Sequence, residues 1–222
     1  MWRAQILCPS ERGTVLLCAL IVITLIATLG AAVTLIVSSE SAVAANYHAS
    51  QQGLYAADAG IERAIAELRT LPAWTAVPSS ATSFSDFNDS QATPQGPDGS
   101  TLNLAQMTVR RQAESDALYG SVPGRPVWRL YAHAPLNRMV PGAGNATPYV
   151  VVWIADDPDE SDGNAAVDTN DVVMLHAEAF TVRRGKRAIE ATIRREEAMA
   201  AGVPGAMRSD VSLIAWQEVL LH

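Results

Sequence analysis

The sequence predicts an α+β protein in which a long N-terminal helix packs on an antiparallel β-sheet. The helix is indicated by an uncharged apolar run at residues 14–39 that continues into an amphipathic stretch at 40–71, with no proline between Pro9 and Pro72. The sheet is indicated by several strand-like segments within residues 102–222. Because no helical pattern separates these segments, antiparallel pairing is favoured.

Composition excludes several classes of protein. Of 222 residues, 49% are hydrophobic and 18% charged, which excludes general disorder. The 16 basic and 23 acidic residues give a net charge of −7, which argues against nucleic-acid binding. Cys8 and Cys18 are the only cysteines and both lie near the N-terminus, so they form neither a disulfide framework nor a zinc ribbon.

The apolar run is long enough to cross a membrane. Residues 14–37 would form a helix of about 36 Å, against a bilayer core of about 30 Å. Arg3 and Arg12 precede the run, and Glu40 is the first charge after it. Positive charge on the N-terminal side predicts a single span with the N-terminus in the cytoplasm.

The residues of this segment are compatible with three interpretations. It is an uncleaved anchor, a secretory signal cut after Ala42-Val43-Ala44, or a helix preceded by a short leader ending at Gly13. A secretory apolar core of about 7–15 residues is much shorter than this run. A glycine before Thr14 suits a peptidase that cuts on the cytoplasmic side and leaves the helix on the mature chain.

The second half of the expected helix, residues 40–71, carries one apolar stripe. Leu54, Ile61 and Leu68 recur every seven residues. Gly60 stands in the same stretch and weakens a helix by ~1 kcal/mol relative to alanine, so a local bend or melting is expected there.

The N-terminal third resembles a known family. The leader ending in Arg12-Gly13, the apolar run, Asn46-Tyr47 and the segment Tyr-Ala-Ala-Asp-Ala-Gly-Ile-Glu at 55–62 resemble the N-terminal region of PilX-type minor pilins. The resemblance covers residues 10–70 and implies the type IV pilin fold. It also implies that prepilin peptidase removes the leader after Gly13, so that Thr14 becomes the mature N-terminus and its amine is methylated.

One position departs from the pilin pattern. Most pilins carry glutamate at the fifth mature position, where the carboxylate meets the N-terminal amine of a neighbouring subunit, whereas this chain has Cys18. An unpaired carboxylate within a membrane costs several kcal/mol, so it drives its subunit to find that partner. Without it, the chain is expected at a filament tip or in a priming complex.

The remainder of the chain is predicted to be a loop followed by a β-domain. Residues 72–101 are rich in Ser, Pro, Asp and Gly and read as a loop. The predicted strands are residues 102–113, 127–133, 149–155, 172–184, 188–195 and 211–221. The apolar run at 149–155 indicates a central strand, and Arg184-Gly185-Lys186 suits a hairpin connection.

An acidic stretch at residues 156–171 contains seven carboxylates and no Lys or Arg. Such clustered hard oxygen ligands suit Ca²⁺. The spacing predicts Asp157, Asp159, Ser161 and Asp168 as ligands, although the glycine of an EF-hand loop is missing. A solvated acidic turn between two strands is the simpler alternative.

No pattern in the sequence indicates catalysis. The zinc-protease, nucleophile-elbow, Walker A and Rossmann motifs are all absent. The four histidines have no metal-ligand spacing around them; they are His48, His133, His176 and His222. The chain is therefore expected not to be an enzyme, and to hold no cofactor apart from the calcium candidate.

The expected organisation follows from these observations. Residues 1–13 form the leader, 14–39 the transmembrane half-helix, 40–71 the amphipathic half-helix, 72–101 a loop and 102–222 the sheet domain. The side chains expected to pack in membrane and filament are Leu16, Leu17, Leu20, Ile21, Ile23, Leu25, Ile26 and Leu29.

The expected role is a minor pilin-like structural subunit that takes part in priming or tip assembly of a type IV pilus or a related secretion pseudopilus. Its expected partners are other major and minor pilins, prepilin peptidase and inner-membrane lipid, and not nucleic acid. The globular part would be periplasmic, then extracellular after assembly. The rival interpretation is a membrane-anchored periplasmic binding or adhesion protein that never polymerises.

Overall fold

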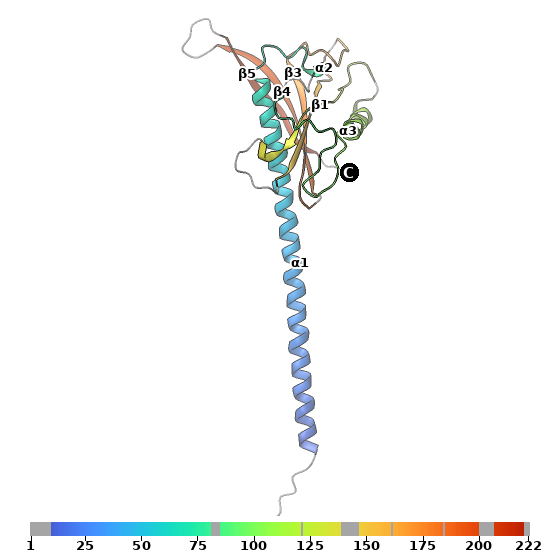
Figure 1. The fold of residues 1–222 in the computed structure, drawn as a ribbon, viewed down its shortest axis with the longest axis vertical. Coiled ribbons are helices and arrows are strands. Elements are labelled where there is room, and N and C mark those ends of the chain that lie inside the picture. Colours follow the sequence, from blue (N-terminus) through green and yellow to red (C-terminus); the bar gives the residue numbers. More distant parts are fainter. Residues whose placement is uncertain are drawn as a thin grey trace, which may run out of the picture. The chain divides into compact units, whose positions relative to one another are not determined.

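The computed structural model describes residues 10–80, 85–120, 122–138, 147–160, 162–183, 185–199 and 207–219. The chain divides into two compact units, residues 1–47 and 48–222. One uninterrupted helix, α1 (Ser10–Leu68), contributes residues to both (Figure 1). The bend or melting expected at Gly60 is not observed, because that residue lies within regular helix.

The first unit consists of the apolar part of α1. Its hydroxyl side chains bond to carbonyl oxygens of the preceding turn: Thr24 Oγ1 donates to Leu20 O at 3.0 Å, and Thr34 Oγ1 to Gly30 O at 2.8 Å. A helix that satisfies its hydroxyl groups internally needs no water for them. This half of α1 is therefore chemically suited to an apolar surrounding.

The second unit is built on a five-stranded antiparallel sheet. The strands are β1 (Arg129–Pro135), β2 (Tyr149–Asp156), β3 (Val172–Phe180), β4 (Lys186–Met199) and β5 (Met207–Val219), and they lie in the order β1-β2-β3-β4-β5. Short helices α2 (Val77–Ser80) and η2 (Leu136–Arg138) complete the connections. The α+β class and the antiparallel pairing expected from the sequence are confirmed.

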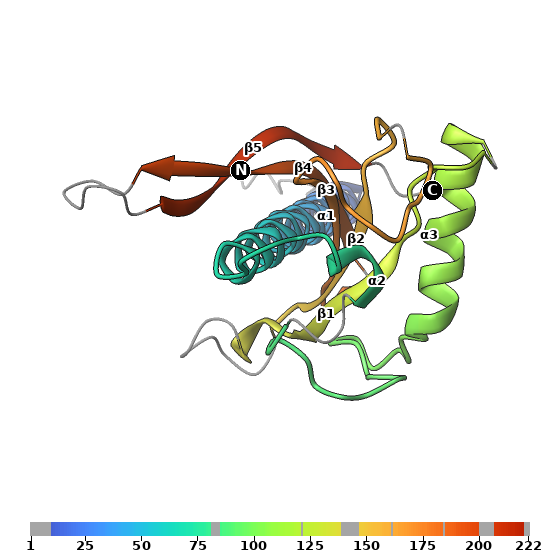
Figure 2. The same cartoon turned by 90° about the horizontal axis from the view of Figure 1, so that it is seen from above.

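Both faces of the sheet are covered. Seen from above, the end of α1 lies along one face and helix α3 (Leu104–Tyr119) along the other (Figure 2). Alternate β2 side chains follow this division, since Val152 joins the cluster that includes α1 and Trp153 the cluster that includes α3. All eight β2 residues are buried, which explains the continuous apolar run and confirms the predicted interior strand.

The packed end of α1 buries its predicted stripe. Ile61 and Leu68 are almost fully buried and Leu54 is partly buried. Trp74 is completely buried beyond the helix, and its indole Nε1 donates to Leu68 O at 3.1 Å. This bond satisfies one of the carbonyl oxygens left open where a helix ends.

The strand predicted at residues 102–113 is wrong, because α3 occupies most of it. Asn103 caps the helix, with its side chain accepting from the backbone N of Gln106 at 3.0 Å. Gly120, with φ of 77°, ends it by donating to Asp116 O at 2.9 Å.

Periodicity explains the error. The buried residues of α3 are spaced three and four apart, which is the period of one helix face: Leu104, Met107, Arg111 and Ser115. Val109 is an apolar residue of the segment predicted as a strand. That side chain is exposed and belongs to the opposite side of the helix.

The hairpin predicted after β3 is confirmed. Thr181 N donates to Gly185 O at 2.9 Å across the turn, and Arg184 lies outside the described residues. Beyond Arg194, which pairs with β3, strand β4 continues and pairs with β5 alone. The strand expected at 211–221 is observed as β5, with residues 220–222 outside the described part.

Candidate functional sites

The apolar side chains of the first unit form the largest exposed hydrophobic surface that the described residues present. The eight predicted packing residues are all exposed, by 51% at Ile21 to 73% at Leu16. Cys18 lies among them as a free, exposed thiol. Within the described ranges, one helix is long and apolar enough to cross a membrane, and it is α1.

The predicted processing position lies near the start of α1. Gly13 and Thr14 are both helical and exposed. A Cβ atom added to Gly13 would meet no other atom within 4 Å, so the surrounding structure does not require a glycine there. Residues 10–12 of the expected leader also belong to α1, and residues 1–9 fall outside the described part of the chain.

Three carboxylates converge where β2 ends and the acidic loop begins. Asp156, Glu160 and Asp168 each place one oxygen within 4.8 Å of the others. Asp156 is 1% exposed and Asp168 2% exposed. Each of the three residues also has one buried carboxylate oxygen that accepts no hydrogen bond from any described residue: Asp156 Oδ1, Glu160 Oε2 and Asp168 Oδ2.

Hydrogen bonds to the other oxygens hold two of these carboxylates in place. Glu160 Oε1 accepts from the backbone N of Thr169 at 2.6 Å and of Asn170 at 2.9 Å. Asp168 Oδ1 accepts from Asn170 N at 3.2 Å, and its own backbone N donates to Thr75 O at 3.2 Å. The loop is thereby fastened to the segment that follows α1.

The surroundings of these carboxylates disfavour their charge. Burial, together with Glu160, Asp168 and Asp157, raises the pKa of Asp156 to about 8. Burial raises the pKa of Asp168 to about 6, although backbone N–H groups act in the opposite direction. No described Lys or Arg forms an ion pair with any of the three carboxylates.

The structure brings together a different set from the predicted calcium ligands. Of those, Asp168 belongs to the converging group. Asp157 is occupied elsewhere, because its Oδ1 accepts from Asn170 Nδ2 at 2.9 Å and its Oδ2 from Asp159 N at 3.1 Å. Asp159 is exposed, and Ser161 lies outside the described residues.

Sequence reasoning missed Asp156 and Glu160 as members of this group. Asp156 is the last residue of β2 and pairs with Val173, so its direction is set by the pleat of the strand. The predicted strand ended at residue 155, so Asp156 could be recognised only if the strand were extended by one residue beyond the apolar run. Glu160 carried no signal in the spacing.

A second polar cluster lies buried between α3 and the sheet. Arg111 Nη2 donates to Glu190 Oε2, and its guanidinium stacks 4.6 Å from the ring centre of Trp128. His176, completely buried, has Nε2 3.6 Å from Glu178 Oε1 and Nδ1 3.5 Å from Glu190 Oε2. No local spacing in the sequence indicates this cluster, because its members come from α3, β3 and β4.

Positive charge keeps these two glutamates ionised. Burial by itself would raise the pKa of Glu178, but His176, Lys186 and Arg110 outweigh it and hold the pKa below its ordinary value. At Glu190, burial is likewise outweighed by His176 and Arg111, and the pKa is lowered. A cluster of mutually compensating charges has the character of a structural element, and it couples α3 to the sheet.

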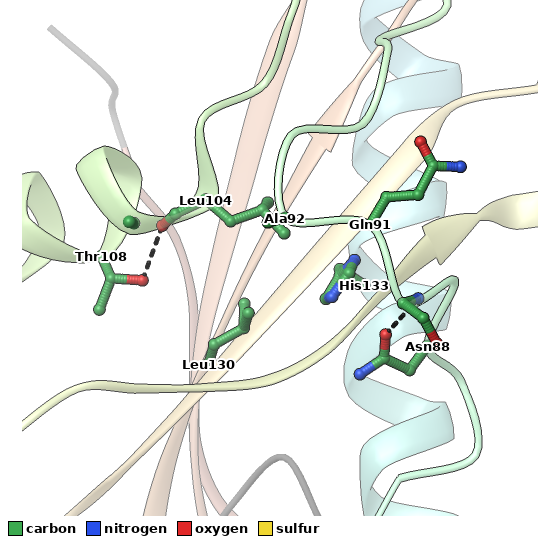
Figure 3. A pocket seen from close by; sticks show the side chains of 9 residues that line it. Asn88, Gln91, Ala92, Leu104, Thr108, Leu130 and His133 are labelled. Carbon is green, nitrogen blue, oxygen red and sulfur yellow. Dashed lines mark hydrogen bonds between the residues drawn. The ribbon is translucent and has the colours of Figure 1, made fainter.

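A mostly apolar groove of about 620 Å³ lies between the loop at residues 88–92, the start of α3 and β1 (Figure 3). Among the described residues that line it, His133 has the only titratable side chain. Its Nδ1 is engaged, lying 2.9 Å from Tyr149 Oη and 3.1 Å from Asp89 Oδ1. Burial lowers the pKa of His133, although Asp89 opposes the shift.

Comparison with known proteins adds no relative to this description. No protein-family model matches the chain, and neither the curated proteins nor the solved structures include a significant match.

Proposed function

We propose that the chain is a minor pilin-like structural subunit that takes part in priming or tip assembly of a type IV pilus or a related secretion pseudopilus. The observation that carries the proposal is the continuity of α1, in which an exposed apolar half is followed by a half packed on an antiparallel sheet.

The exposed half of α1 requires an apolar environment. Side chains such as Leu16, Leu20 and Ile23 are more than 60% exposed, and soluble monomers rarely expose so large an apolar surface. Lipid supplies that environment while the subunit is in the inner membrane. Helices of other pilins would supply it in a filament, where van der Waals packing replaces the lipid contacts.

The proposed role is structural rather than enzymatic. In the groove, His133 is 4% exposed, and its Nδ1 lies beside Tyr149 Oη and Asp89 Oδ1. His176 is fully buried between two ionised glutamates. Both arrangements are consistent with a folded domain that presents a surface.

Cys18 supports placement at a tip or in a priming complex. It occupies the position at which most pilins carry a glutamate, and it lies exposed on α1. A thiol does not need the intersubunit partner that a carboxylate would need in the same environment. A subunit without that requirement can begin an assembly.

The N-terminus of the native protein tests the proposal. Intact-mass measurement of the chain recovered from host membranes should give a species that begins at Thr14 and carries one additional methyl group. The rival interpretation, a membrane-anchored binding or adhesion protein that does not polymerise, predicts a chain that begins at Met1. A chain that begins at Ala45 would be a secreted protein. Either of these two results would overturn the proposal.

A pair of glycine variants makes the test specific. Gly13→Leu should block cleavage and leave the leader attached, whereas Gly30→Leu should be processed normally. The two positions are matched, because both are exposed glycines of α1 at which an added Cβ meets nothing within 4 Å. Equal processing of both variants would contradict cleavage after Gly13.

A further inference from the structure

We propose that Asp156, Glu160 and Asp168 form a binding site for one divalent cation, of which Ca²⁺ fits best. The inference is independent of the role proposed for α1. It rests on two observations: the three residues each bring one oxygen within 4.8 Å of the others, and each has a buried oxygen that lacks a partner among the described residues.

The separation of these oxygens matches a shared ion. Ca²⁺ binds oxygen at 2.3–2.6 Å, so two of its ligands lie at most about 5 Å apart. The three converging oxygens lie within 4.8 Å of one another. Carboxylate oxygens are the donors that Ca²⁺ and Mg²⁺ prefer, whereas zinc and copper sites favour nitrogen and sulfur.

Burial makes the group costly without an ion. Asp156 and Asp168 are 98–99% buried, each has one oxygen that accepts no hydrogen bond, and no described Lys or Arg forms an ion pair with either, so their negative charge is destabilising. Oxygens that face one another also repel. A divalent cation would remove both penalties.

Protonation is the competing way to remove the charge, since burial raises the pKa of both Asp156 and Asp168. A Ca²⁺ titration separates the two explanations, because a cluster that is only protonated would bind no ion.

The loop around the three carboxylates favours Ca²⁺ over Mg²⁺. Mg²⁺ requires near-ideal octahedral geometry and gives up its water reluctantly, whereas Ca²⁺ accepts six to eight oxygens in irregular arrangements. This site lies in a loop closed by backbone hydrogen bonds to Glu160 and Asp168. Such a loop can supply carbonyl oxygens or water to an irregular shell.

Binding of the ion would stabilise the connection between the acidic loop, strand β2 and the segment that follows α1. Asp156 belongs to β2, and Asp168 bonds through its backbone to Thr75, in the segment that follows α1. An ion held by both residues would fix the acidic loop between the sheet and the end of the helix.

Thermal unfolding of the full-length chain in detergent tests the site. We expect Tm to rise by roughly 5–10 °C when CaCl₂ replaces EDTA at about 100 times Kd. Calorimetric titration should give one Ca²⁺ per chain, and Mg²⁺ should produce a smaller shift at equal concentration. The absence of a Ca²⁺-dependent shift, or a larger shift with Mg²⁺, would overturn the assignment.

Matched variants locate the ion. Asp168→Asn should abolish the Ca²⁺-dependent shift, and Asp159→Asn should keep it, although both remove one negative charge from the same loop. Asp156→Asn should likewise abolish the Ca²⁺-dependent shift, because it removes one of the three carboxylates. A shift lost in Asp159→Asn and kept in Asp168→Asn would place the ion elsewhere and overturn the proposal.

Discussion

A Cβ atom placed on Gly60 of α1 would lie 2.7 Å from Cγ1 of Val150 in β2. It would also lie 3.3 Å from Cγ2 of Val152. The glycine in the middle of the helix therefore marks the closest approach of α1 to the sheet. Glycine at this position makes the helix less stable than alanine would, but it allows the close contact with the sheet.

Gly60→Ala should lower the free energy of unfolding by up to about 2 kcal/mol. The alanine gains helix propensity of ~1 kcal/mol, but overpacking against Val150 costs about 1–3 kcal/mol. Gly30→Ala is the matched control, since its Cβ meets nothing within 4 Å, and it should be neutral or stabilising. Chemical denaturation of both variants measures the difference.

The clash itself can be tested by a second substitution. Val150→Ala removes the methyl groups that the new Cβ would meet, so the double variant with Gly60→Ala should be more stable than the sum of the single effects predicts. Strict additivity would show that the close approach does not determine the cost.

The ion pair between Arg111 and Glu190 should be a main anchor of α3. Both side chains are about nine-tenths buried, so Arg111→Met would leave the Glu190 carboxylate buried without its partner. We expect a loss of about 3–5 kcal/mol in the free energy of unfolding. Arg69→Met, which removes an exposed pair with Asp210, should cost less than about 1 kcal/mol. Equal losses would contradict a special role for the buried pair.

His133 should make stability depend on pH. Burial lowers its pKa in the folded protein below the ordinary value of 6.5, so the unfolded chain binds a proton more readily. The contribution of His133 to stability is complete above pH 6.5 and is lost as the pH falls through the folded pKa. His133→Gln should remove this part of the pH dependence, and His48→Gln, at an exposed position, should retain it.

An imidazole titration followed by nuclear magnetic resonance gives an independent measurement. A midpoint for His133 at or above 6.5 would contradict this prediction. The difference between His133→Gln and the unsubstituted chain is the informative quantity, because Asp156, whose pKa is raised, changes stability in the opposite direction over pH 4–8.

Cys18 should report helix packing in the assembled state. If the leader is removed, Cys18 is the only cysteine of the chain, and it is exposed on the apolar part of α1. Mild oxidation of membranes should give disulfide-linked dimers or adducts with other subunits, and Cys18→Ala should give none. A cysteine introduced at exposed Leu118 in the Cys18→Ala chain controls for random collision. Equal cross-linking at both positions would contradict specific packing.

Local patterns predicted most of the fold. The apolar run of α1, the stripe of Ile61 and Leu68, and the continuous apolar β2 each express a period that burial imposes directly on the sequence. The exception was α3, because its buried face includes Arg111 and Ser115 and therefore lacked a clear apolar period. Polar residues on a buried face conceal a helix from periodicity.

For the candidate cation site, the sequence predicted the loop but not the correct set of carboxylates. The carboxylate count pointed to residues 156–171, but Asp157 uses its oxygens to close turns with Asn170 and Asp159. Which oxygens remain free depends on how the loop folds back on the chain, through Glu160 and the backbone of Asn170. Spacing in the sequence does not contain that information.

The order of strands in the sheet bears on how the domain folds. Each strand pairs with its neighbour in the sequence, so pairing requires no long crossover and the sheet can grow by successive hairpins. The link between β3 and β4, residues 181–185, closes at a smaller entropic cost than the acidic link between β2 and β3, residues 157–171. Amide protection during refolding should therefore appear first in the β3–β4 hairpin. The acidic link would then be the slow closure, and an ion that organises it would act on the rate of folding as well as on the stability of the finished domain.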